Sequence, residues 1–232
     1  ITSGSLPIGL SLNSSTGIIS GIPSQAMSSQ SVTINALNQV SNQSFSLSFT
    51  VITPITSFSY LQSSYVLPIN GSFSVAPTVD GDELSFSIIS GSLPIGLSLN
   101  QSTGMISGIP SQSVSSQSVT IKAFNEVSDQ SFSLSFTIQL IPSSLNYNQT
   151  IFIIQNNTYF IIKPTCEGDD LSFSIISGSL PIGLSFHSST GIISGTPLSS
   201  IPLTNITIQA SNQVGSTQFT ISIQVIIPLS NL

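Results

Sequence analysis

The sequence predicts an all-β chain built from tandem β-sandwich domains with a period of 87 residues. One observation behind this fold class is the strict alternation of apolar and Ser/Thr side chains over short segments. Such alternation places the apolar set on one face of a half-buried antiparallel strand. The other observation is a sequence block that recurs at constant spacing. Gly and Pro separate the segments, and no segment combines a helical period with caps, so we expect little or no helix.

The recurring block begins at Gly4–Ser11 and returns at Gly91–Ser98 and Gly178–Ser185, 87 residues apart both times. Residues 1–50 and 88–137 are identical at 41 of 50 positions. A period of this length is too long for a solenoid, helical or propeller repeat. It suits one complete small β-domain.

The elements follow from the local pattern. Alternation predicts strands at residues 32–36, 45–51 and 84–88. Residues 6–9 predict a turn, because Pro fixes φ and Gly permits a positive φ. Residues 13–17 turn the chain again, so this stretch is interpreted as a hairpin with a structural role.

The period divides the chain into an incomplete repeat at residues 1–55, a second repeat at 56–142 and a third at 143–232. The first repeat lacks its N-terminal strands, the counterpart of residues 58–87. A neighbouring segment could fill the exposed face by strand addition. The plainer interpretation is a window cut from a longer repetitive chain.

The stretch Leu93–Asn100 with Ser102–Pro110 resembles the He-PIG type of immunoglobulin-like repeat, and Thr190–Pro197 keeps its second half most literally. Upstream, Asp80–Phe86 resembles a segment of cadherin-like domains. The resemblance covers all three copies. It implies tandem immunoglobulin-like β-sandwich domains of a large modular surface protein, and it implies no catalytic activity.

The amino-acid composition excludes some classes of function. Of 232 residues, 2 are Lys or Arg and 8 are Asp or Glu, against 52 Ser and 19 Thr. The two cations, Lys122 and Lys163, make no basic footprint, which excludes nucleic-acid binding. No apolar run approaches the ~18 residues of a membrane span. Because sandwich edges and surfaces normally rely on charge, we expect either a glycan coat or self-association.

Candidate chemical groups are sparse. His187 is expected to be an exposed turn residue, and Cys166 a small hydrophobe without a second thiol for a metal site. We therefore expect no enzyme and no organic cofactor. The acidic residues form two matching clusters that predict either a weak Ca²⁺ site or a polar turn before a strand: Asp80, Asp82 and Glu83, then Glu167, Asp169 and Asp170.

Asn-x-Ser/Thr sequons predict covalent N-glycans, although about four would arise by chance in so Ser-rich a chain. Asn13 and Asn100 fall in the predicted hairpin turn, where a glycan would be accessible. The candidate sites are Asn13, Asn42, Asn70, Asn100, Asn148, Asn156 and Asn205.

Three functional hypotheses follow. The first is a structural component of an extracellular, glycosylated filament or cell-surface stalk, with further copies of itself as partners. The alternative is an adhesin that binds surface carbohydrate or protein through the divergent loops of the third repeat, near Tyr147, Tyr159 and Phe160. The third is an accessory repeat of an enzyme whose catalytic domain lies elsewhere.

Overall fold

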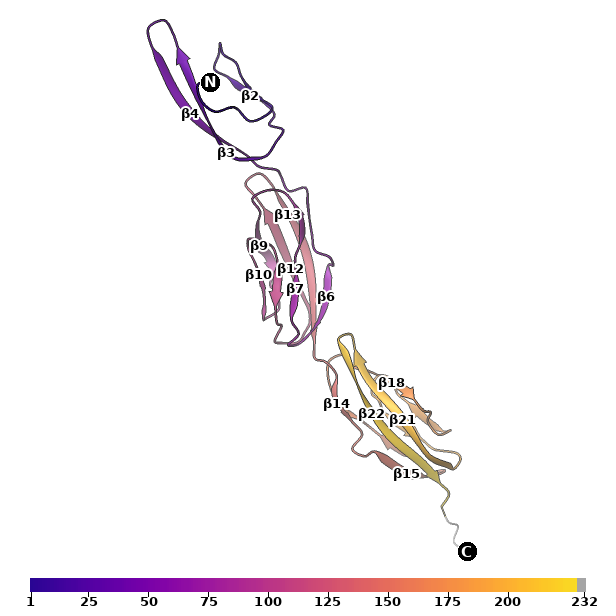
Figure 1. Cartoon of the computed structure of the whole chain (residues 1–232). Coiled ribbons are helices and arrows are strands. Elements are labelled where there is room, and N and C mark those ends of the chain that lie inside the picture. The colour runs from indigo at the N-terminus through magenta and orange to yellow at the C-terminus, as the bar shows by residue number, and fades with distance from the viewer. Residues whose placement is uncertain (229–232) are drawn as a thin grey trace.

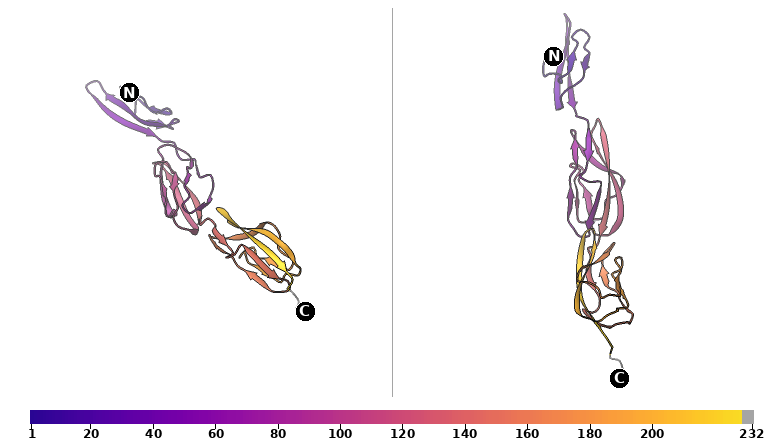
Figure 2. Two further views of the ribbon diagram at one scale, coloured as in Figure 1. Left: turned by 60° about the horizontal axis from the view of Figure 1, so that its bottom comes forward. Right: turned by 90° about the vertical axis from the view of Figure 1, so that its right-hand side faces the viewer.

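The computed structural model describes residues 1–228, and this part of the chain contains strands and no helix. The strands form three elongated modules that follow one another in a single row, one for each repeat (Figure 1). Two further views show the same end-to-end arrangement (Figure 2). Without a helix, the described residues offer no helical membrane span.

The second repeat is a complete two-sheet sandwich. A four-stranded sheet of order β6-β13-β12-β9 and a three-stranded sheet of order β10-β11-β7 enclose one core, and β5 pairs with β8. All pairs are antiparallel except β6 with β13, which run parallel. The strands are β5 (Ser57–Ser59), β6 (Ser64–Pro68), β7 (Phe73–Val75), β8 (Thr78–Asp80), β9 (Ser85–Gly91), β10 (Leu97–Leu99), β11 (Ile106–Gly108), β12 (Val114–Phe124) and β13 (Asp129–Gln139).

The third repeat copies this arrangement. Its sheets have the orders β15-β22-β21-β18 and β16-β20-β19, and β14 pairs with β17. The expected extent of this repeat includes residues 229–232, which lie outside the described residues. The strands are β14 (Ser143–Asn146), β15 (Ile151–Gln155), β16 (Phe160–Ile162), β17 (Thr165–Glu167), β18 (Ser172–Ser177), β19 (Leu184–Phe186), β20 (Ile193–Gly195), β21 (Ile201–Asn212) and β22 (Gly215–Ile226).

The predicted alternation decides which side chains enter the core. In β12, Val119, Ile121 and Ala123 are buried, while Thr120 and Lys122 between them point outward. Burial of each large aliphatic side chain contributes about 1.5–3 kcal/mol. The apolar stripe of one sheet therefore holds it against the other, and the Ser/Thr stripe remains on the surface. The expectation of an all-β chain with tandem β-sandwiches is confirmed.

The glycines of the recurring block allow two backbones to touch. A Cβ on Gly21 would lie 2.0 Å from the carbonyl oxygen of Gly9, so only glycine fits there. At the tip of this hairpin, Oδ1 of Asn13 accepts the N–H groups of Ser15 and Thr16 at 3.0 and 3.1 Å. The block is thus a fixed structural turn.

The first repeat consists of two separate hairpins. β1 (Leu10–Leu12) pairs with β2 (Ile19–Gly21), and β3 (Met27–Leu37) pairs with β4 (Asn42–Val51). Its boundary needs one refinement, because Ile55, expected as its last residue, is 4% exposed and packs in the core of the second repeat.

Candidate functional site at the junctions between repeats

At the first junction, the linker is fastened to the second repeat by a set of hydrogen bonds that we call the linker clamp. The N–H of Thr53 donates to Oδ2 of Asp82 at 3.1 Å, and the N–H of Asp82 donates back to the carbonyl of Thr53 at 3.4 Å. Nδ2 of Asn125 donates to the carbonyls of Thr53 and Asp82 at 3.0 and 2.9 Å. The linker two residues beyond β4 is therefore held by two loops of the following repeat.

The second junction repeats the clamp, 87 residues further on. Leu140 donates to Oδ2 of Asp169 at 2.8 Å, and Asp169 donates to the carbonyl of Leu140 at 3.4 Å. Nδ2 of Asn212 donates to the carbonyls of the same two residues, at 2.8 and 2.9 Å. Two junctions with different linker sequences thus use the same fastening.

The orientation of the clamp asparagine, Asn125, is fixed by hydrogen bonds within its own turn. Oδ1 of Asn125 accepts the N–H groups of Val127 and Ser128 at 3.1 and 2.9 Å, which caps the turn between β12 and β13. The cap fixes the amide plane, so that Nδ2 faces the linker. Asn is suited to this double task because its amide carries an acceptor and two donors.

The clamp also acts on the carboxyl group of Asp82. Hydrogen bonds from Thr53, through its side chain and its backbone N–H, hold the pKa of Asp82 below its usual value of 3.8. The ionised carboxylate is the form that accepts these bonds. The clamp is therefore complete near neutral pH.

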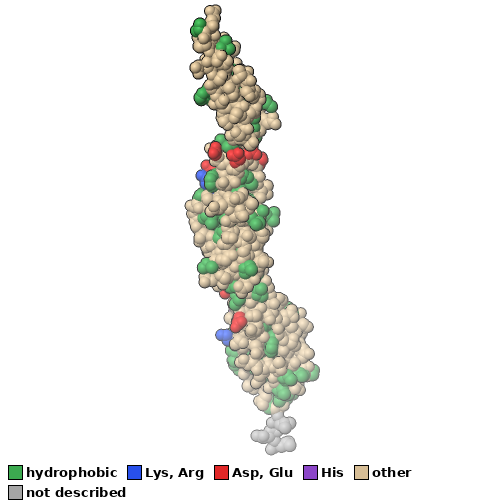
Figure 3. Space-filling view, turned by 60° about the vertical axis from the view of Figure 1, so that its left-hand side comes forward, with side chains coloured by type: hydrophobic (Ala, Val, Ile, Leu, Met, Phe, Trp, Pro, Cys, Tyr) green, Lys and Arg blue, Asp and Glu red, His purple; other side chains and the backbone are tan. Residues whose placement is uncertain are grey.

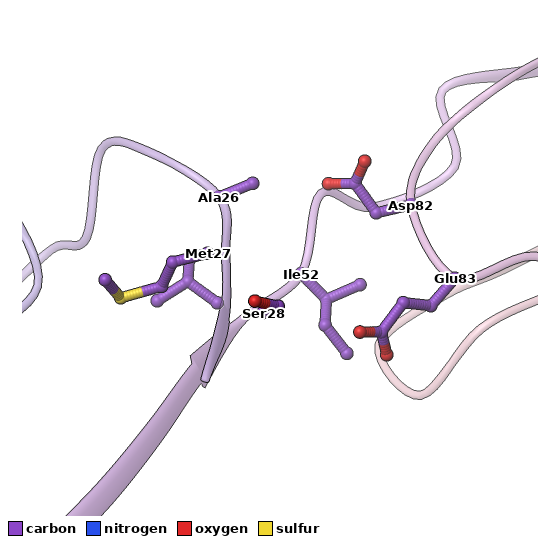
Figure 4. A pocket seen from close by; sticks show the side chains of 7 residues that line it. Ala26, Met27, Ser28, Ile52, Asp82 and Glu83 are labelled. Atoms are coloured by element: carbon purple, nitrogen blue, oxygen red, sulfur yellow. The ribbon is translucent and has the colours of Figure 1, made fainter. Parts of the chain in front are cut away.

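A shallow hollow lies at each junction, between the end of one repeat and the acidic loop of the next. The hollow at the first junction, about 320 Å³, has Met27 on one side and Asp82 and Glu83 on the other (Figure 4). Its counterpart at the second junction is about 200 Å³. There Gln139, 4% exposed, donates from Nε2 to Oδ2 of Asp170 at 2.8 Å, a direct bond between two repeats.

The predicted acidic clusters both lie at the junctions, and Figure 3 shows acidic side chains gathered at the boundary of the first two repeats. Besides the clamp carboxylates, Asp80 accepts from the hydroxyl of Thr56 at 3.0 Å, and Glu167 from that of Ser143 at 3.2 Å. Within residues 1–228, no three His, Cys, Asp or Glu side chains form a group that could hold a metal ion. Ca²⁺ binding stays a prediction.

The sequon asparagines lie mostly on the surface. Six are exposed and Asn156 is partly buried. In the hairpin turns, Asn13 and Asn100 use Oδ1 to accept backbone N–H groups. N-glycosylation attaches at the other amide atom, so the turn and a glycan are compatible. Occupancy of all seven sites stays a prediction.

The two lone reactive side chains have ordinary surroundings. His187 is exposed in the hairpin turn of the third repeat, and Nδ1 lies 3.1 Å from the hydroxyl of Ser189. Cys166 is partly buried against the third core, and burial raises the pKa of its thiol.

The sequence patterns did not reveal the clamp asparagines or the buried Tyr60. The expectation that Tyr147 lies at an adhesive loop is wrong for its side chain, which is 2% exposed and packs in the third core. The hydroxyl of Tyr60 donates to the carbonyl of Gly104 at 2.5 Å, and that of Tyr147 to Gly191 at 2.5 Å. Burial raises the pKa of both phenols, so both remain donors. The signal that could have revealed them is recurrence at the 87-residue period in otherwise polar stretches.

These features define a tandem array of immunoglobulin-like sandwiches joined by clamped linkers. The family described as "Putative Ig domain" matches residues 1–54, 49–141 and 136–226, and the chain belongs to this family. No curated protein matches the chain.

Solved structures of tandem domains share the fold. A titin fragment of domains I67–I69 aligns with a TM-score of 0.54 at 13% identity, over 95% of this chain and 82% of that one. Extracellular domains 3–5 of Drosophila OTK align with a TM-score of 0.55 at 11% identity, over 96% and 78%. Sidekick-1 immunoglobulin domains 1–4 align with a TM-score of 0.55 at 11% identity, over 95% and 64%.

Proposed function

We propose that this chain is a non-catalytic structural segment of an extracellular stalk or filament, in which clamped linkers hold successive repeats in line. The observation that carries the proposal is the recurrence of the same linker clamp at both junctions. A flexible linker would expose its backbone to water, whereas these linkers give their carbonyl and N–H groups to the next repeat. Such fastening restricts the hinge between modules and favours a stiff rod.

Surface chemistry supports an extracellular, glycosylated setting. With 4% charged residues, the modules lack the charge that usually keeps sandwiches apart. Six exposed sequon asparagines, and Ser/Thr on the outward stripe of the strands, offer attachment points for glycans. A glycan coat would replace surface charge as the barrier to association.

Electron microscopy of material taken from its natural source tests this proposal. We expect extended rods or fibres with an axial repeat of one module, and added density at the sequon asparagines. Treatment with an N-glycosidase should lower the mass of the protein and convert each occupied Asn to Asp. Strongly bent chains with variable angles at the junctions would contradict the rod, and an unchanged mass would contradict N-glycosylation.

A second candidate function, adhesion, is favoured by the apolar surface of the third repeat. Tyr159 is 65% exposed, and Ile161, two residues further along in β16, is 57% exposed. A carbohydrate array probed with the whole chain tests this candidate. Binding that Tyr159→Ser abolishes would support adhesion, and an array without signal would count against carbohydrate recognition.

A further inference from the structure

The edge of the four-stranded sheet in the third repeat is formed by β15, on the flank of the module (Figure 1). The N–H of Ser222 in β22 donates to the carbonyl of Thr150 at 2.7 Å, just before β15 begins. Just after β15 ends, the N–H of Asn156 donates to the carbonyl of Ile226 at 3.0 Å. Successive residues of a strand direct their N–H and C=O groups to opposite sides, so every second residue of β15 faces away from β22. The residues whose backbone groups face the open edge are therefore Ile151, Ile153 and Gln155.

The open edge of β15 is apolar and carries none of the usual protection. The side chains of Ile151 and Ile153 are 54% and 62% exposed, and the second repeat has Ser64 at the position of Ile151. Edge strands are normally kept from pairing with another chain by charged side chains, Pro or a bulge. β15 contains no charged residue and no Pro, and its register with β22 is unbroken. Such an edge is a template for strand pairing.

The equivalent edge strand of the second repeat, β6, is protected by a proline. The N–H of Ile69 donates to the carbonyl of Gln139 at 2.9 Å, so the preceding residue, Pro68, faces the open edge. Because Pro has no N–H, the edge of β6 lacks a donor there. The third repeat has Gln155 at this position, which restores the donor.

Neighbouring repeats do not cover this edge. The second repeat has another repeat on each side, yet in the described part of the chain β6 pairs with β13 alone. We therefore look for the cover of the β15 edge on the surface of the third repeat itself.

Two of the predicted glycosylation sites lie at the two ends of β15. Asn148, which is exposed, stands three residues before the strand, and Asn156, which is partly buried, follows it directly. The second repeat has Leu61 and Ile69 at these positions, so both sequons belong to the complete repeat whose edge lacks the proline. The strand between them is only about 17 Å long. Bulky glycans at both ends would therefore stand over the whole edge.

We propose that N-glycans attached to Nδ2 of Asn148 and Asn156 cover the edge of β15 and prevent it from pairing with β15 of a second copy of this chain. A second copy fits the bare edge, because antiparallel pairing about a two-fold axis places Ile153 opposite itself and Ile151 opposite Gln155. This pairing brings no like charges together, since the strand has none. The inference rests on the proposed N-glycosylation and gives two of the sequons a specific role.

The whole chain, secreted from cells that attach N-glycans, tests the proposal in variants that differ in their sequons. Thr150→Ala combined with Thr158→Ala removes the two sequons beside β15 and leaves both asparagines in place. Analytical ultracentrifugation should show that this variant self-associates at least about tenfold more tightly than the unsubstituted chain. On association, hydrogen exchange should slow in β15 and stay unchanged in β6.

Two further variants separate pairing at β15 from a general loss of glycans. Ser15→Ala combined with Ser102→Ala removes the same number of sequons from the hairpin turns, while Asn13 and Asn100 keep their turn contacts. This control should associate no more tightly than the unsubstituted chain. Gln155→Pro, added to the variant without sequons beside β15, gives this edge the proline of the second repeat and should abolish the added association.

The outcomes distinguish this inference from the proposed function. Treatment of the unsubstituted chain with an N-glycosidase should convert both Asn148 and Asn156 to Asp, and an unchanged mass at these sites would contradict their glycosylation and this inference together. With both sites occupied, equal association of the two sequon variants would overturn this inference alone. Protection from exchange that appears only outside β15 would do the same.

Discussion

Replacement of the clamp asparagine by aspartate removes hydrogen bonds of the linker clamp while keeping the turn that the same side chain caps. In Asn125→Asp, one carboxylate oxygen still caps the turn, but the other faces the carbonyls of Thr53 and Asp82 in place of the donating Nδ2. Two hydrogen bonds are lost, each with a net contribution of about 0.5–1.5 kcal/mol. Because one of them is exposed, we expect a loss of about 1–2 kcal/mol, or about 5–15 °C in the melting temperature of a module this size.

The first repeat offers a matched control. Asn38 is the equivalent of Asn125, and its Oδ1 caps the same turn by accepting from Val40 and Ser41 at 2.9 and 2.8 Å. Among the described residues, only Oδ1 of the Asn38 side chain makes hydrogen bonds, and its Nδ2 makes none. Asn38→Asp should therefore change stability by less than about 0.5 kcal/mol.

Guanidinium denaturation followed by hydrogen exchange measures the free energy of unfolding of each repeat separately. Exchange at Thr53 should accelerate in Asn125→Asp, and small-angle scattering should show a broader distribution of chain shapes. Equal stability losses in Asn125→Asp and Asn38→Asp would refute the reasoning, because the turn cap alone would then account for the effect.

Three further predictions rest on single contacts. Tyr147→Phe removes the hydroxyl that donates to Gly191 and leaves a buried carbonyl without a hydrogen bond. Calorimetry should show that the free energy of unfolding of the third repeat falls by about 1–3 kcal/mol. A decrease below about 0.5 kcal/mol would contradict this prediction. The folded pKa of Asp82 lies below 3.8, so its clamp hydrogen bonds stabilise the fold above pH 3.8, and this stabilisation is lost as pH falls through the folded pKa. The hydrogen-exchange rate of the Thr53 N–H, corrected for the intrinsic rate, should therefore be constant from about pH 7 to 5 and rise in more acidic solution. A change confined to neutral pH would contradict the role of Asp82. Ca²⁺ needs several oxygen ligands, and the clamp already engages carboxylate oxygens of both acidic clusters in hydrogen bonds. Calorimetric titration with Ca²⁺ should therefore give a dissociation constant of about 1 mM or weaker. Micromolar binding would contradict this prediction.

Much of the fold follows from local patterns in the sequence. Val119, Ile121 and Ala123 alternate with polar residues, and this period alone specifies which face of β12 is buried. The glycines at 9 and 21 mark the close backbone approach of a hairpin. Recurrence at 87 residues gives the number of modules.

The pairing of strands that lie far apart in the sequence could not be predicted from local patterns. The parallel pairing of β6 with β13 joins segments about 71 residues apart, such as Ser64 and Ser135, and short strands carry no local signal for their partner. The clamp shows the same limitation. Asn125 contacts Thr53 and Asp82, which lie 72 and 43 residues away, so only the folded chain brings the three together.

The parallel pairing has a mechanical consequence for a chain that carries load along its length. β6 lies near the start of the second repeat and β13 at its end, and five residue pairs join them; β15 and β22 are joined by five pairs in the third repeat. A pull on the two ends of a module drags these parallel strands in opposite directions, so their hydrogen bonds are sheared together instead of opening one after another. We expect force spectroscopy to show a high rupture force for the second repeat and another for the third.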